Sequence, residues 1–68
     1  DEFLLMGLRL AEGIDPARYH ALSGRPLDER RIGSLLGDGL IVRHAGGRLR
    51  VTAEGFPVLD AVVADLAA

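Results

Sequence analysis

The sequence predicts a small, mostly helical α+β domain that is winged-helix-like. Apolar residues recur at helical spacing in four segments, and between the third and the fourth the spacing changes to alternation. Two adjacent glycines divide the alternating stretch, which is typical of a β-hairpin. We therefore expect three helices, a two-stranded hairpin over about residues 40–52 and a C-terminal helix.

The composition limits how such a domain is stabilised. With 68 residues the chain is a single domain, 1–68, and a domain of this size buries only about 60% of the surface that its unfolded chain exposes. The sequence contains no cysteine, so neither a disulfide nor a thiolate zinc site supplements the core. Aromatic residues make up only 4% of the chain, so we expect an aliphatic core.

The ends and the hydropathy of the chain suggest its setting. The first residue is Asp rather than Met, and an apolar helical segment begins at once, so we interpret the chain as a domain excised from a larger protein. No apolar run approaches the roughly 20 residues that span a bilayer. We expect no membrane span and a cytoplasmic location.

The first helix is expected over residues 1–12, because acidic residues stand at its start and Gly13 follows its end. A polar stripe leaves a wide apolar arc, and Leu5 falls on the polar side. Leu5 is either a stray surface leucine or part of a face that packs against something absent, and we favour the second interpretation. The residues expected to be buried are Leu4, Leu8 and Ala11, with Phe3, Met6 and Leu10.

Helix-capping residues mark the next two helices. Asp15 before Pro16 is a strong helix start, which predicts a short helix from Pro16 to about Leu22. A break then leads to a third helix that opens at Asp28 or a neighbour, ends near Gly39 and occupies the position of a winged-helix recognition helix. Its buried face contains Ile32, Leu35 and Leu36. Two glycines one turn apart within it, Gly33 and Gly37, are expected to permit a close backbone contact.

The hairpin and the last helix follow from the change of period. Gly46 and Gly47 supply the positive φ angles of a tight turn between two alternating strands. Thr52 is expected to cap a final helix with Glu54 in its first turn and Pro57 in its second. The buried stripe of this helix comprises Leu59, Val62, Val63 and Leu66.

The positive charges concentrate in the middle of the chain. Residues 25–50 hold six arginines against three acidic residues, although the whole chain has a net charge of −2. Arginines of the third helix and the hairpin form the one site-like group, an anion patch in one interpretation. The favoured interpretation is a solvated face or a surface docked onto a neighbouring domain, because the helix lacks Asn, Gln and Lys for reading base edges. The group consists of Arg30, Arg31, Arg43, Arg48 and Arg50.

No catalytic or metal-binding constellation is predicted. The two histidines are separated by a helix and lack other ligands at metal-binding spacing, and the serines lack a base and an orienting acid. Paired carboxylates fall on helix faces that we expect to be solvated. The residues weighed and set aside are His20, His44, Ser23, Ser34, Asp28, Glu29, Asp60 and Asp65.

Four segments carry a resemblance to a known family: LLMGLRLAEGID, DGLIV, RLRVT and TAEGFPVLDAVVADL. Over essentially the whole chain, from Glu2 to Leu66, the sequence resembles the C-terminal domain of oxygen-independent coproporphyrinogen III oxidase-like proteins. That family includes the radical-SAM coproporphyrinogen dehydrogenases and the related haem chaperones, and the chaperone branch is the one we favour. The resemblance implies a parent whose N-terminal radical-SAM barrel holds a [4Fe–4S] cluster and S-adenosylmethionine.

For this chain, the resemblance implies an accessory role without a cofactor or catalytic residue of its own. The domain would pack on the barrel, shield the radical chemistry from water and help to shape the tetrapyrrole pocket. Arg9 and the hairpin arginines are candidate partners of tetrapyrrole carboxylates, although Arg9 is expected to pair with Glu12 or with the missing barrel. Whether the parent is an oxidase or a haem chaperone stays open.

Two other classes of function remain as alternatives. The element order and the central arginines are also those of a winged-helix nucleic-acid-binding module, which the lack of base-reading side chains in the third helix disfavours. A protein-interaction module that uses the same wing surface is the weaker alternative.

Overall fold

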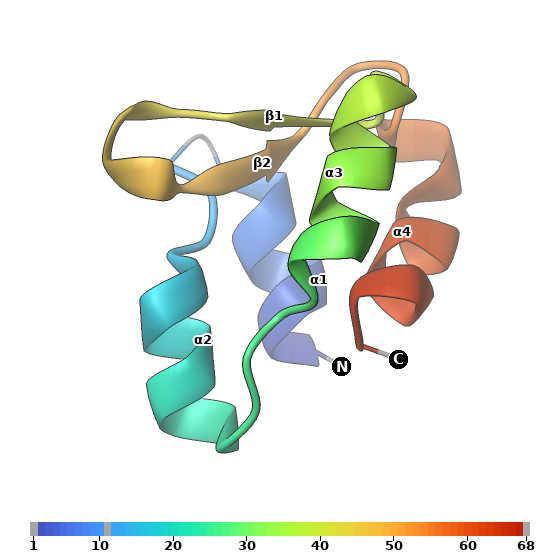
Figure 1. The fold of residues 1–68 in the computed structure, drawn as a ribbon. Helices are drawn as coiled ribbons and strands as arrows, with labels where there is room; N and C mark the ends of the chain where they lie inside the picture. Colours follow the sequence, from blue (N-terminus) through green and yellow to red (C-terminus); the bar gives the residue numbers. More distant parts are fainter. Residues whose placement is uncertain (1, 11, 68) are drawn as a thin grey trace.

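The computed structural model describes residues 2–10 and 12–67, and its elements follow the predicted order. The helices are α1 (Glu2–Arg9), α2 (Pro16–Ser23), α3 (Glu29–Gly37) and α4 (Leu59–Ala67), and the strands are β1 (Ile41–Arg43) and β2 (Leu49–Val51). The hairpin crosses one end of the helices, and α1 begins and α4 ends at the other end (Figure 1). The fold is thus mostly helical α+β, as the sequence predicts.

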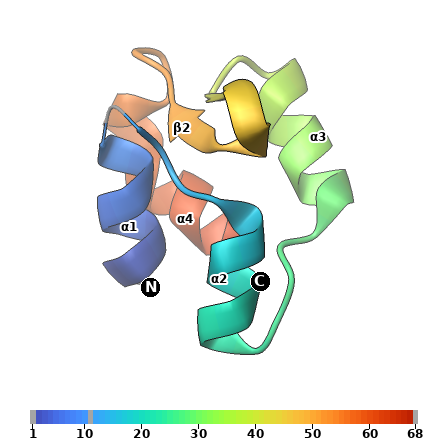
Figure 2. The same ribbon diagram turned by 90° about the vertical axis from the view of Figure 1, so that its left-hand side faces the viewer.

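Aliphatic side chains of α1, α3, α4 and the hairpin form one core. Helix α4 packs against both α1 and α3, which in turn contact the sheet, whereas α2 lies in front of α4 in the view of Figure 2. Tyr19 anchors α2, because its side chain is buried and its ring lies 5.9 Å from that of Phe3. The most deeply buried side chains are Leu4, Leu8, Ile32, Leu49 and Val62.

The helix caps predicted at Asp15 and Asp28 are confirmed. The Asp15 carboxylate accepts a hydrogen bond from the backbone N–H of Ala17 at 2.9 Å, and that of Asp28 accepts one from Arg30 at 2.8 Å. Each satisfies a donor that has no partner within its helix. The two signals therefore fix where α2 and α3 begin.

The hairpin has the predicted turn. Its strands are antiparallel, with Ile41 opposite Val51 and Arg43 opposite Leu49. Gly46 and Gly47 have φ angles of 77° and 80°, as the tight turn requires. Ile41, Leu49 and Val51 face the core, whereas Val42 is exposed.

The segment between α1 and α2 adds a partial third strand to this sheet. The backbone N–H of Ile14 donates to the carbonyl of Leu49 at 2.7 Å, and the N–H of Leu49 donates to Ile14 at 2.8 Å. Gly13, at a φ of 73°, precedes this pairing, and a Cβ there would lie 2.3 Å from the Leu49 oxygen. Glycine is therefore required both for the backbone angle and for the close approach.

This pairing explains why α1 is shorter than predicted. The α-helix ends at Arg9 rather than near residue 12, because the chain turns so that Ile14 can reach β2. A hydrogen bond from the Gly13 N–H to the Leu10 carbonyl closes that turn. Ala11, which we expected to be buried, and Asp1, in the predicted first turn, lie outside the described residues.

Three other expectations about the fold are wrong. Phe3, Met6 and Leu10 are exposed rather than buried, since the core accommodates only one side of α1. A Cβ at Gly33 or Gly37 would meet no atom of the described residues within 4 Å, so neither glycine serves a close contact with them. Thr52 does not cap the last α-helix, which begins only at Leu59. The Thr52 hydroxyl instead accepts a hydrogen bond from the Gly55 N–H and closes a separate turn, and a 3₁₀ turn over Phe56–Val58 follows before the helix.

The chain contains no helix, within its described ranges, that is both long and apolar enough to cross a membrane.

The role of Gly13 can be tested by comparing two alanine substitutions. Gly13→Ala combines an unfavourable φ with overlap onto the Leu49 carbonyl, so we expect a loss of about 3 kcal/mol or more in the free energy of unfolding. Gly46→Ala has the same kind of φ but open space around it, so the expected loss is about 1–2 kcal/mol. Urea unfolding followed by circular dichroism measures both. Equal losses would show that the approach of Ile14 to Leu49 is not the constraint.

Candidate functional site

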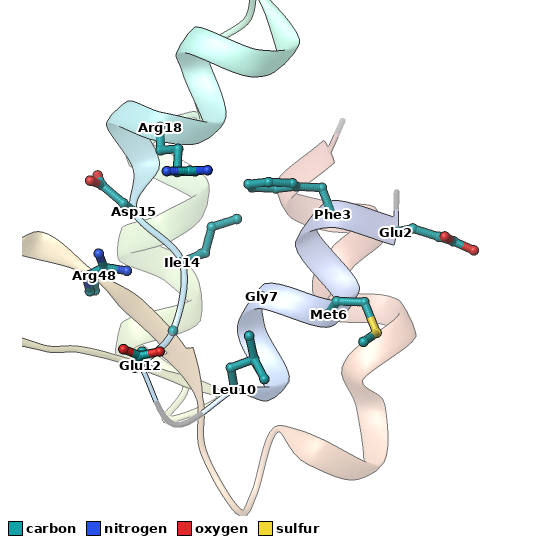
Figure 3. A pocket seen from close by; sticks show the side chains of 11 residues that line it. Glu2, Phe3, Met6, Gly7, Leu10, Glu12, Ile14, Asp15, Arg18 and Arg48 are labelled. Carbon is teal, nitrogen blue, oxygen red and sulfur yellow. The ribbon is translucent and has the colours of Figure 1, made fainter.

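The outer side of α1 presents an apolar face to solvent, here called the α1 face and defined by Phe3, Met6 and Leu10. Their exposed fractions are 39%, 54% and 54%, and they share one side because they are three and four residues apart. With Ile14 they line an open hollow of about 720 Å³ beside the segment that enters α2 (Figure 3). The hollow lies on the outside of the fold.

Charged side chains of both signs surround this hollow. Arg18 extends from α2 toward Phe3 (Figure 3). Arg48, the residue directly before β2, also lines the hollow. Glu2, Glu12 and Asp15 also line the hollow, and the Asp15 carboxylate already caps α2. An apolar centre with a charged rim is the arrangement of a protein–protein contact.

Gly7 of α1 allows the Ile14 side chain to approach the helix closely. A Cβ at position 7 would lie 3.2 Å from the Cβ of Ile14, which is tighter than ordinary van der Waals contact. Gly7 therefore allows the segment after α1 to run against the helix. The cost of a helical glycine, up to about 1 kcal/mol, is offset by this packing.

Leu5 does not belong to the α1 face. Its side chain is half-buried and packs against the core, where it also lines a shallow hollow with Asp60 and Val63 of α4. The sequence signal, an apolar arc too wide for one core, is therefore correct, but the surplus side chains lie on the opposite side of α1 from the one we expected.

The predicted arginine group is divided among several places. Arg31 of α3 pairs with Asp65 of α4 at 2.9 Å and with Asp28 at 3.8 Å. Arg43 of β1 pairs with Glu29 at 3.6 Å. These two arginines thus connect elements of the chain itself. Arg30 lines a hollow with Arg31, Ser34, Asp28 and Asp65.

Arg9 and Arg50 share a different hollow, at the end of α1. The Arg9 guanidinium carbon lies 5.9 Å from the centre of the Phe56 ring, over its face. Arg50 lines the same hollow from β2. In the described part of the chain Arg9 forms no ion pair with Glu12, and its pairing with the missing barrel stays a prediction. Spacing along the sequence gave no sign that Phe56 would meet Arg9.

The potential metal-ligating side chains of residues 2–10 and 12–67 are dispersed over the fold. No three of their His, Cys, Asp or Glu side chains are grouped so that they could hold a metal ion. His20 and His44 are both exposed.

Comparison with models of protein families gives one match. The model of the HemN C-terminal domain matches residues 1–58. The chain belongs to this family. The searches of curated proteins and of solved structures gave no match.

The match confirms the resemblance predicted from the sequence. The matched residues, 1–58, include the whole of three of the four segments that carry the resemblance: LLMGLRLAEGID, DGLIV and RLRVT. The match ends at Val58, within the fourth segment. The α1 face, the Ile14–Leu49 pairing and the hairpin all lie in the matched part, whereas α4 lies beyond it.

The ion pair between Arg31 and Asp65 should contribute little to stability. Both side chains are about 40% exposed, so a double-mutant cycle with Arg31→Ala and Asp65→Ala should give a coupling of about 0.2–1 kcal/mol. The coupling should decrease in 1 M NaCl because salt screens exposed charges. The matched pair of Arg43 with Glu29 is longer, and its glutamate is 76% exposed, so we expect a smaller coupling there. A coupling above 2 kcal/mol would contradict this description.

Proposed function

We propose that this HemN C-terminal domain is the non-catalytic part of a larger radical-SAM protein of the oxygen-independent coproporphyrinogen III oxidase-like type. In this proposal the domain packs on the catalytic barrel through the α1 face and helps to shape or shield the tetrapyrrole pocket. Membership of the family supports the choice of parent. The observation that carries the docking role is the exposed apolar α1 face.

The free energy gained by burying the α1 face supports docking. Full burial of a side chain such as Leu, Met or Phe contributes about 1.5–3 kcal/mol, so covering three that are roughly half exposed would contribute on the order of 1 kcal/mol each. Arg18 and Arg48 at the rim can form polar contacts around that centre. Since no reacting group takes part, the docking role is the same whether the parent oxidises coproporphyrinogen or delivers haem.

The cofactors of the proposed parent do not fit the residues of this chain. Iron–sulfur clusters are held by cysteine thiolates, and the sequence contains none. The described residues also offer no metal-binding group of other side chains. The proposal therefore assigns the [4Fe–4S] cluster and S-adenosylmethionine to the barrel, in a cytoplasmic parent protein.

Nucleic-acid binding is disfavoured by the ion pairs. In a winged helix, α3 would enter the major groove and its basic side chains would contact DNA. Here Arg31 and Arg43 face acidic side chains of the same chain, and Arg30 lies beside Asp28. Binding DNA would require breaking or screening these contacts.

Titration with duplex DNA tests that alternative. At 50 mM NaCl we expect no saturable binding of a 20-base-pair duplex below 100 μM, because the exposed arginines are few and partly neutralised. Fluorescence anisotropy of labelled duplex is the measurement. Micromolar binding that weakens steeply as salt is raised would favour the nucleic-acid module instead.

The docking role is tested in the complete gene product that contains this domain, expressed anaerobically. We expect the absorption of a cysteine-ligated iron–sulfur cluster, and we expect Met6→Glu with Leu10→Glu to increase the rate of limited proteolysis of the domain at least 10-fold. The charged side chains would be accommodated in water but not in an apolar interface. The domain's own core should be unaffected, since both positions are about half exposed.

Val42→Glu is the matched control, because Val42 is an exposed apolar residue on the hairpin, away from the α1 face. It should leave the proteolysis rate unchanged. Equal effects of the two changes would contradict docking through the α1 face, and the absence of the cluster absorption would contradict the radical-SAM parent.

A further inference from the structure

The hollow at the end of α1 is distinct from the one beside the α1 face. Its volume is about 460 Å³, and three segments that are far apart in sequence contribute to it. Arg9 comes from the end of α1, Arg50 from β2 and Phe56 from the 3₁₀ turn before α4. The remaining lining residues are Val51, Thr52 and Ala53.

The charge of this hollow is positive. Its charged lining side chains are the guanidinium groups of Arg9 and Arg50, whereas the hollow at Arg30 and Arg31 also contains the carboxylates of Asp28 and Asp65. Within residues 2–10 and 12–67, neither Arg9 nor Arg50 forms an ion pair. Two positive groups that share a hollow repel each other, so an anion placed between them is stabilised by both.

The fold places both arginines at this hollow. The Arg9 guanidinium lies over the Phe56 ring, at 5.9 Å from its centre, which restricts its plane. Arg50 is the middle residue of β2, whose backbone is paired with β1 on one side and with Ile14 on the other. The planar guanidinium group of an arginine can bind a carboxylate in a bidentate manner.

The Phe56 ring defines what else the ligand must carry. It is 52% exposed beside the two guanidinium groups, so a ligand that covers the hollow must present an apolar group next to its anionic group. Protein segments with Asp or Glu beside an apolar side chain have this chemistry. Duplex DNA fits less well, since its affinity comes from many phosphates along an extended basic surface and this hollow offers two positive groups.

We propose that the hollow of Arg9, Arg50 and Phe56 is a binding site for an acidic segment of the catalytic region, whose carboxylate pairs with the two arginines. The inference rests on the proposed function in one respect: the partner is the catalytic region of the same gene product. It adds a polar anchor at a position separate from the α1 face, and it specifies the charge that the partner must present.

Cross-linking in the complete gene product tests this directly. The present chain contains no lysine, so Arg9→Lys or Arg50→Lys introduces an amine at the chosen position. A water-soluble carbodiimide then joins the lysine Nζ to a nearby carboxyl carbon as an amide and takes up the displaced oxygen to become a urea. We expect mass spectrometry to find an amide between the new lysine and an Asp or Glu outside residues 1–68.

Arg30→Lys is the matched control, because position 30 lies beside the domain's own Asp28 and Asp65. Its cross-links should stay within the domain. If position 9 or 50 gives no cross-link, or cross-links only within residues 1–68, the site is not an acidic-segment site and the inference is overturned. Saturable binding of duplex DNA that the double change Arg9→Gln, Arg50→Gln abolishes would also overturn it.

A second measurement separates this inference from the proposed function. The double change Arg9→Gln, Arg50→Gln should increase limited proteolysis of the domain at least 5-fold at 50 mM NaCl, with a smaller increase at 500 mM because salt already screens the pairs. If Met6→Glu with Leu10→Glu increases the proteolysis of the domain and the arginine changes do not, the proposed docking through the α1 face is supported and the inferred acidic-segment site is contradicted. If neither pair of changes has an effect, both fall.

Discussion

The pairing of Ile14 with Leu49 is the contact on which the arrangement of the other elements depends. It joins the segment after α1 to β2 by two backbone hydrogen bonds, so α1 is placed against the sheet and α2 begins directly beyond it. Gly13 makes the approach possible, and Gly7 lets the same segment run against α1. The hollow beside the α1 face is formed by these two close approaches.

The elements with local signals were predictable. Asp15 and Asp28 mark the starts of α2 and α3 because an N-cap acts within a few residues, and Gly46 and Gly47 mark the turn because of their own φ angles. The early end of α1 and the late start of α4 were not predictable in this way. Both depend on partners that are distant in sequence. The end of α1 depends on Leu49, and the start of α4 depends on the backbone of Gly39 and Leu40, which contacts Thr52 and Gly55.

The same distinction applies to the functional surfaces. The periodicity of the first helix shows that its apolar arc is wider than one core needs, but only the packing of α4 determines that Leu5 turns inward and Met6 outward. Likewise, the arginine-rich middle of the sequence suggests one patch. The fold instead pairs Arg31 and Arg43 with acidic neighbours and brings Arg50 beside Arg9, which lies outside that stretch.

The Ile14–Leu49 pairing also constrains the order in which the chain can fold. The two residues are separated by about half of the sequence, and contacts of such long range form only after the entropy of closing the intervening loop has been lost. During synthesis α1 emerges well before β2, and until β2 follows, its apolar inner side has neither the sheet nor α4 to cover it. The domain therefore acquires its native form late, once nearly all of it has left the ribosome, and its N-terminal helix is the segment most in need of protection in the meantime.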